Sequence, residues 1–151
     1  MTPVETVYNA FLSKVLEDEW GYDTWSEEEI KRDLSLILAA ALPNFKFPKV
    51  SLDIVTNENE EECFEGDLNN SEIQILATYM KCEWLNRNIM TWENIKPLYE
   101  ERDFSQANLL DKLNVTLSYE KAQAKELESI YYRSINRKPF DYRSFASKVE
   151  K

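Results

Sequence analysis

The first twenty residues place their apolar side chains on one side of a helix. Seven of these side chains recur at helical spacing, namely Val4, Val7, Tyr8, Phe11, Leu12, Val15 and Leu16. Pro3 suits the first helical position, and Thr2 and Glu5 have the spacing of a capping box. Because Gly21 follows Trp20 and glycine commonly ends helices, we expect this helix to stop near Trp20.

A second helical pattern begins after Ser26 and is wider than a single face. Ser26 and Glu29 have the spacing of a capping box, and Pro43 marks the end of the pattern. Its apolar residues are Ile30, Leu34, Leu36, Ile37, Leu38, Ala39, Ala40, Ala41 and Leu42. Because apolar residues cover most sides of this helix, we expect it to lie at the centre of the core.

Residues 50–68 change from helical spacing to the alternation of strands. The alternating apolar residues are Val50, Leu52 and Ile54. An acidic loop over residues 57–62 separates them from a second short stretch at residues 63–68. We expect a small β-hairpin, which has to pack on the helices or on a neighbouring subunit because a lone hairpin is marginally stable in water.

The third helix has the clearest start in the chain. Asn69 and Glu72 are spaced as a capping box, and Leu68 and Ile73 as a hydrophobic staple. One face carries Ile73, Leu76, Ala77, Met80 and Trp84, with Arg87 at its end. Because Ile75, Tyr79, Cys82 and Leu85 lie off this face, we expect the helix to be covered on more than one side.

The longest predicted helix runs from Gln106 to about Ile135, with Ser105 as its N-cap. At ~1.5 Å per residue it would span roughly 45 Å. Its inner face carries Leu110, Leu113, Leu117, Ala124, Leu127 and Tyr131. Glu120 interrupts this apolar face.

The chain therefore predicts a mainly α fold, a bundle of about four helices with one long C-terminal helix, a small β-hairpin insertion and an extended C-terminal tail. We divide it into a helical domain over residues 1–135, with the hairpin near 50–68, and an arm over residues 136–151.

The arm carries five Lys/Arg and two Asp/Glu, which gives it a net charge of +3. The whole chain has a net charge of −10, so the other residues sum to −13. Pro139 prevents the long helix from continuing through the arm. This reversal of charge indicates a role in contacting a partner.

The chain lacks residues on which many catalytic and metal sites depend. It has no histidine, which removes Ser-His, Cys-His and most zinc chemistry. Its two glycines cannot form a phosphate-binding loop, and the separated Cys63 and Cys82 make no metal motif. The consecutive acids at residues 60–62 lack the pattern of a calcium loop. We expect no enzymatic activity, no metal and no cofactor, and both cysteines as reduced thiols.

Charge and hydropathy argue against three further classes of protein, namely nucleic-acid-binding, membrane-spanning and secreted proteins. The acidic total argues against free-standing nucleic-acid binding, because phosphate contacts need clustered Lys and Arg. The most apolar stretch, residues 34–42, is too short to span a membrane. The N-terminal sequence lacks the basic and apolar regions of a signal peptide, so we expect no secretion.

Two stretches carry a resemblance to a known family. They are LNNSEIQILATYMKCEWLNRNI at residues 68–89 and ERDFSQANLLDKLNVTLSYEKAQAKELESIYYRSI at residues 101–135. The earlier YNAFLSKV and LILAAALPNFKFP fit the same pattern. With these segments the chain resembles the neck proteins of tailed bacteriophages, the head-to-tail connector or adaptor family.

The resemblance implies a structural virion protein that is made in the bacterial host cytoplasm and assembles into the phage neck. Such subunits form rings, commonly of twelve copies, which extend the DNA channel beneath the portal protein and dock the next neck or tail component. DNA then passes through during ejection without specific binding, and no membrane is involved. The family's C-terminal segment typically reaches the portal, a role that would here fall on residues 136–151. Its anchoring and orienting residues would be Phe140, Tyr142, Phe145, Arg137, Lys138 and Arg143.

Two other classes remain open from the sequence. One is a small acidic helical protein that regulates a nucleic-acid enzyme by mimicking DNA, and the other is an accessory subunit of an enzyme. A ring or a concentration-dependent oligomer favours the adaptor. A stable monomer that blocks DNA binding favours the mimic.

Overall fold

Four helices and a small sheet make up the described parts of the computed structural model, which are residues 1–15, 25–95 and 104–135. The helices are α1 (Val4–Lys14), α2 (Glu27–Ala41), α3 (Asn70–Ile95) and α4 (Phe104–Ile135), and a 3-10 turn, η2 (Leu42–Asn44), follows α2. The strands are β1 (Thr2–Pro3), β2 (Ile54–Thr56) and β3 (Glu62–Phe64). The predicted mainly α fold, with one long C-terminal helix and a small β insertion, is confirmed.

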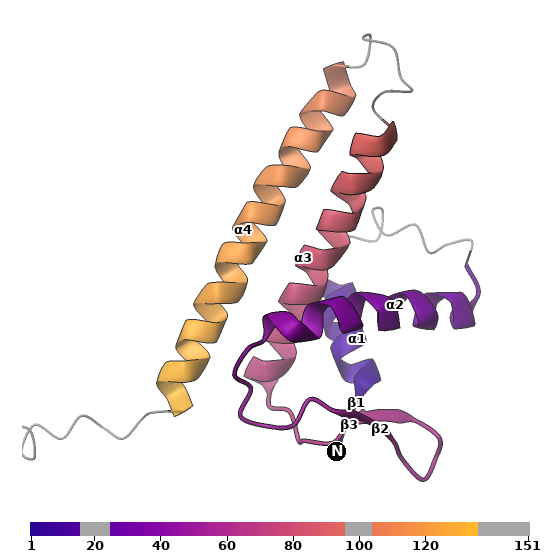
Figure 1. Ribbon diagram of the computed structural model, residues 1–151, viewed down its shortest axis with the longest axis vertical. Helices are drawn as coiled ribbons and strands as arrows, with labels where there is room; N and C mark the ends of the chain where they lie inside the picture. Colours follow the sequence, from indigo (N-terminus) through magenta and orange to yellow (C-terminus); the bar gives the residue numbers. More distant parts are fainter. Residues whose placement is uncertain (16–24, 96–103, 136–151) are drawn as a thin grey trace, which may run out of the picture.

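The helices form a long antiparallel pair with a smaller body at one end. In Figure 1, α3 and α4 run side by side, whereas α1 and α2 lie across the lower half of α3 and the sheet lies at the bottom. Helix α3 packs against each of the other three helices. Its predicted core residues Leu76, Met80 and Trp84 are buried, and so are Ile75 and Leu85 on its other sides.

Helix α2 is not the central helix, contrary to the expectation from its width. Only one side is buried, through Asp33, Leu34, Ile37, Leu38 and Ala41. Leu36 is 63% exposed, and Ala39 and Ala40 are exposed beside it. The reason is that α3 takes the central position and α2 packs across it by one face.

The start of α1 differs from the predicted capping box. Pro3 occupies the N-cap position without a side-chain cap, and the preceding residues form β1. The Thr2 hydroxyl instead donates to the carbonyl of Gly66 at 3.3 Å and accepts the N–H of Leu68 at 2.8 Å. Strand pairing with β3 therefore replaces local capping.

The end of α1 also comes earlier than Trp20. The helix stops at Lys14, and Val15 is already extended. This end places a lysine in the last turn, where the helix dipole favours a cation, rather than the acids at residues 17–19. Residues 16–24 lie outside the described part of the chain.

Both other capping boxes are confirmed by reciprocal hydrogen bonds. The Glu29 N–H donates to Ser26 Oγ at 3.3 Å, and the Ser26 N–H donates to Glu29 Oε2 at 3.1 Å. The Glu72 N–H donates to Asn69 Oδ1 at 2.9 Å, and the Asn69 N–H donates to Glu72 Oε1 at 2.8 Å. Helix α4 begins at Phe104, so Ser105 lies inside its first turn rather than capping it.

The predicted hairpin is confirmed as β2 and β3, and β1 adds a third strand in the antiparallel order β1-β3-β2. The sheet packs on the chain's own core through Cys63 and Phe64, which are buried. Its exit requires a glycine, because a Cβ on Gly66 would lie 2.8 Å from the carbonyl oxygen of Ser51.

Candidate assembly surfaces

The six predicted partner-binding residues all fall in residues 136–151, outside the described part of the chain. The structure describes the helix that precedes them. Helix α4 ends at Ile135, at the lower left of Figure 1, and the arm follows it in the sequence. The contacts that hold this end are therefore the described part of the candidate site.

A buried carboxylate fixes the end of α4 to the start of α3. Glu72 is 1% exposed, and its Oε2 accepts the hydroxyl of Tyr131 at 2.9 Å. The Tyr131 oxygen in turn accepts the N–H of Lys49 at 2.8 Å. Phe45 packs edge-on against the Tyr131 ring with centroids 5.4 Å apart. The network therefore joins α3, α4 and the segment after η2.

A second carboxylate, that of Glu128, lies on α4 about one turn before Tyr131 and Tyr132. Glu128 accepts hydrogen bonds from the hydroxyls of Tyr79, on α3, and of Tyr132, the latter at 2.8 Å. Phe47 approaches the Tyr132 ring with centroids 6.2 Å apart. Burial and the neighbouring carboxylate raise the pKa of Tyr79, so its hydroxyl keeps its proton and remains a donor.

Two ion pairs tie the helices together farther along the bundle. Lys81 Nζ on α3 lies 2.9 Å from Glu120 Oε1 on α4, so the charge that interrupts the predicted apolar face has a partner across the interface. Arg87 binds both carboxylate oxygens of Asp33 on α2, at 2.5 and 3.0 Å. Bidentate geometry of this kind fixes orientation as well as distance.

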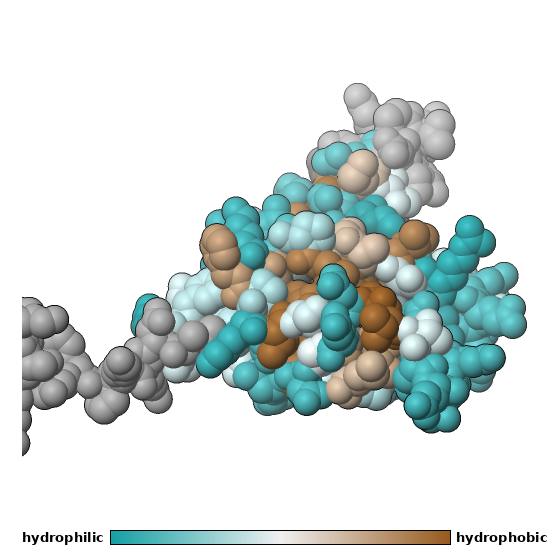
Figure 2. Space-filling view, turned by 60° about the horizontal axis from the view of Figure 1, so that its bottom comes forward, coloured by the Kyte–Doolittle hydropathy of each residue, from teal (hydrophilic) through white to brown (hydrophobic). Residues whose placement is uncertain are grey.

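The outer faces of the helices carry exposed apolar side chains. On α4 these are Val115, Tyr119 and Ile130, and on α2 they include Leu36. Met1, Phe47 and Ile54 are exposed at the sheet and the segment before it. Figure 2 shows apolar surface among hydrophilic residues on the face at the bottom of Figure 1. These side chains are available for contact with other chains.

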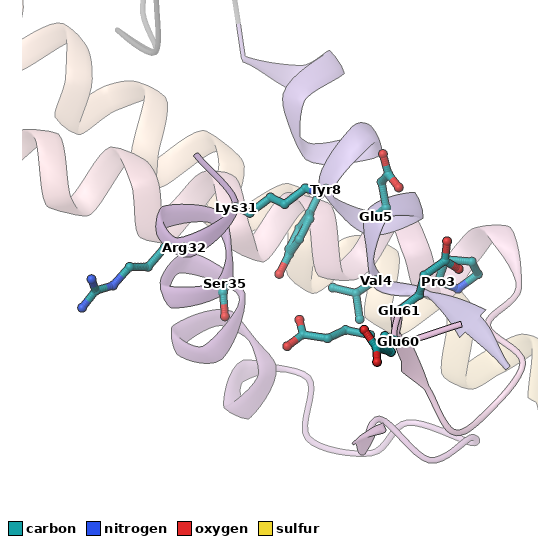
Figure 3. Close-up of a pocket in the computed structure, with 10 residues that line it drawn as sticks. Pro3, Val4, Glu5, Tyr8, Lys31, Arg32, Ser35, Glu60 and Glu61 are labelled. Atoms are coloured by element: carbon teal, nitrogen blue, oxygen red, sulfur yellow. The ribbon is translucent and has the colours of Figure 1, made fainter. Parts of the chain in front are cut away.

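A hollow of about 520 Å³ lies between α1, α2 and the hairpin loop. In Figure 3, the Tyr8 hydroxyl points toward α2 and Arg32 points away. Burial and Glu62 raise the pKa of Tyr8.

Within residues 1–15, 25–95 and 104–135, no group of three or more Cys, Asp or Glu side chains is arranged to hold a metal ion.

Sequence reasoning missed the two tyrosine–carboxylate networks. The sequence indicates Glu72 as a capping residue and Tyr131 as an inner-face residue, but no sequence signal links residues so far apart.

Comparisons of the chain with protein families, curated proteins and solved structures find no match. Among the described helices, none is long and apolar enough to cross a membrane.

Proposed function

We propose that the protein is a head-to-tail adaptor of a tailed bacteriophage, located at the virion neck. Copies assemble into a ring beneath the portal protein, extend the DNA channel and dock the next neck or tail component. The sequence resemblance at residues 68–89 and 101–135 supports this proposal. The mainly helical fold agrees with what that resemblance implies.

The observation that carries the proposal is the anchoring of α4 immediately before a basic, aromatic segment. Tyr131 and Tyr132 hold the last turns of the helix against α3 and the segment after η2. Residues 136–151 follow this helix in the sequence. In this proposal the segment is the portal-binding arm, with Phe140, Tyr142 and Phe145 as buried anchors. Arg137, Lys138 and Arg143 orient it electrostatically.

The charge distribution suits a channel through which DNA passes. Residues 1–135 carry a net charge of −13. A negatively charged wall repels the phosphate backbone, because binding to DNA requires clustered cations that replace its counterions. DNA would therefore slide past the ring without being held.

The experiment is attachment of purified protein to DNA-filled, tailless heads. We expect loss of attachment when residues 136–151 are removed and when Phe140, Tyr142 and Phe145 are changed together to serine. The matched control changes Ser144 and Ser147 to alanine, which alters the arm but keeps its aromatic and basic residues. Attachment of the truncated protein at the wild-type level would refute the role of the arm.

The runner-up is an acidic mimic of DNA. It is favoured by the exposed acids at the tip of the hairpin, Glu58, Glu60 and Glu61, and at the start of α2. Helix α4 argues against it, because its four Lys/Arg balance its four Asp/Glu and leave no row of phosphate-like charge. A stable monomer that displaces DNA from a nucleic-acid enzyme would favour the mimic.

A further inference from the structure

We propose that the outer face of α4 in one copy packs against the outer face of α2 in the next copy, in a head-to-tail contact. The inference rests on the proposed assembly and names the subunit contact within it. It requires two different surfaces on one chain, complementary in shape and charge, and the described residues supply both.

The first surface, the α4 stripe, consists of Val115, Tyr119, Glu126 and Ile130. The apolar members are 70%, 60% and 52% exposed in chain order. Their spacings of four and eleven residues place them on one side of the helix. The opposite side carries Leu117, Ala124 and Tyr131, which are buried toward the rest of the protein. Helix α4 is thus apolar on two sides, of which the described residues cover one.

The second surface, the α2 face, consists of Arg32, Leu36, Ala39 and Ala40, all of them exposed. A hollow of about 370 Å³, lined in part by Arg32 and Leu36, lies beside it. The two alanines have short side chains, so a neighbouring helix can approach α2 closely. Large side chains such as Val115 and Tyr119 can then pack against Leu36 and the alanines, as ridges fit grooves between helices.

Charge complements this difference in shape. Glu126 lies in the α4 stripe between Tyr119 and Ile130, and Arg32 lies one turn before Leu36 on α2. Within the described residues neither forms a salt bridge. An arginine and a glutamate beside matching apolar residues can pair across the contact and set its orientation.

Head-to-tail pairing accounts for both surfaces at once. If α4 paired with α4 of a second copy, the assembly would stop at a dimer and leave Leu36 in water. Pairing of α4 with α2 gives each copy one donor and one acceptor surface, so copies add successively and form a ring when the rotation closes.

Two one-sided variants test this arrangement, because Tyr119→Asp disables only the α4 stripe and Leu36→Asp only the α2 face. The size of the full-length chain is measured by analytical ultracentrifugation up to about millimolar concentration, where weak contacts are populated. Wild-type protein should form oligomers beyond dimers. Each variant alone should be monomeric, with its dissociation constant raised about 30-fold or more, as for a central interface residue. Their equimolar mixture should form a dimer and nothing larger, since one intact contact remains.

Ser118→Asp is the matched control, because Ser118 is exposed next to Tyr119 but points about 100° away around the helix. It should self-associate like wild type, and all variants should show wild-type helical circular dichroism. The reversals Arg32→Glu and Glu126→Arg should each weaken assembly, and the double variant should restore it.

Three outcomes would overturn the inference. They are a monomeric wild type throughout the concentration range, wild-type assembly by Leu36→Asp, and a mixture of the one-sided variants that stays monomeric. These measurements contain no portal-bearing heads. A failed head-attachment test with intact self-association would therefore reject the portal role and keep the subunit contact.

Discussion

Tyr131→Phe tests whether the buried network at the end of α4 has the energetic weight that its geometry indicates. The substitution removes only the hydroxyl and keeps the ring that packs against Phe45. It leaves Glu72 Oε2 without its bond from Tyr131 and the N–H of Lys49 without its acceptor. The buried Glu72 oxygen would then be desolvated without compensation, whereas the Lys49 N–H belongs to an exposed residue.

The expected loss of unfolding free energy follows from these two groups. A hydrogen bond to a charged group contributes about 1.5–3 kcal/mol, and an ordinary one about 0.5–1.5 kcal/mol. Because Lys49 is exposed and water can partly replace its bond, we expect a total of about 2–4 kcal/mol. This is a large share of the roughly 5–15 kcal/mol of a typical domain.

The assay is urea unfolding at neutral pH, followed by far-ultraviolet circular dichroism. Tyr132→Phe is the matched control, because it removes a hydroxyl from the adjacent residue while Glu128 keeps its bond from Tyr79. We expect this control to lose only about 0.5–1.5 kcal/mol. Equal losses in the two variants would refute the conclusion that the Glu72 network stabilises the end of α4 more than its neighbour does.

Three further predictions address the core, the sheet and the tyrosines. Trp84→Ala should lower the unfolding free energy by about 3–5 kcal/mol in urea titrations, whereas Ala at the exposed Met90 should change it by under about 0.5 kcal/mol. Gly66→Ala should cost about 1–3 kcal/mol, because its Cβ would force the backbone away from Ser51, and a wild-type melting temperature would contradict this. Burial and Glu72 raise the pKa of Tyr131 from 10 to about 12, so its stabilising effect is complete below pH 10 and is lost as the pH rises toward about 12. Urea titrations across this range should therefore show a steeper alkaline loss in wild type than in Tyr131→Phe.

Local signals in the sequence predicted the features that depend on nearby residues. The boxes at Ser26 and Asn69 need only a side chain and a backbone group three residues away, so their spacing was sufficient. The buried faces of α3 and α4 followed from helical periodicity for the same reason.

Features that depend on distant residues could not be predicted in this way. Thr2 is a residue type that commonly caps helices, but its hydroxyl forms hydrogen bonds with residues more than sixty positions away. The width of the apolar pattern in α2 suggested a central helix, because hydrophobicity alone cannot distinguish burial in the core from a surface that another chain could cover. The sequence shows Glu120 only as a charge within an apolar face. Its partner Lys81 lies on another helix, so the ion pair could be identified only from the structure.

The polar contacts at the end of α4 do something that apolar packing alone would not. Replacing a buried polar pair with apolar side chains of similar shape is often neutral for stability, so stability is a weak reason for such a network. Hydrogen bonds constrain direction, however, and Glu72, Tyr131 and Lys49 together define one position for the last turns of the helix. A binding segment loses conformational entropy when it docks, and that loss is smaller when its first residue starts from a fixed place. In the proposed adaptor, the network would therefore act on attachment through the geometry of the helix from which the arm continues.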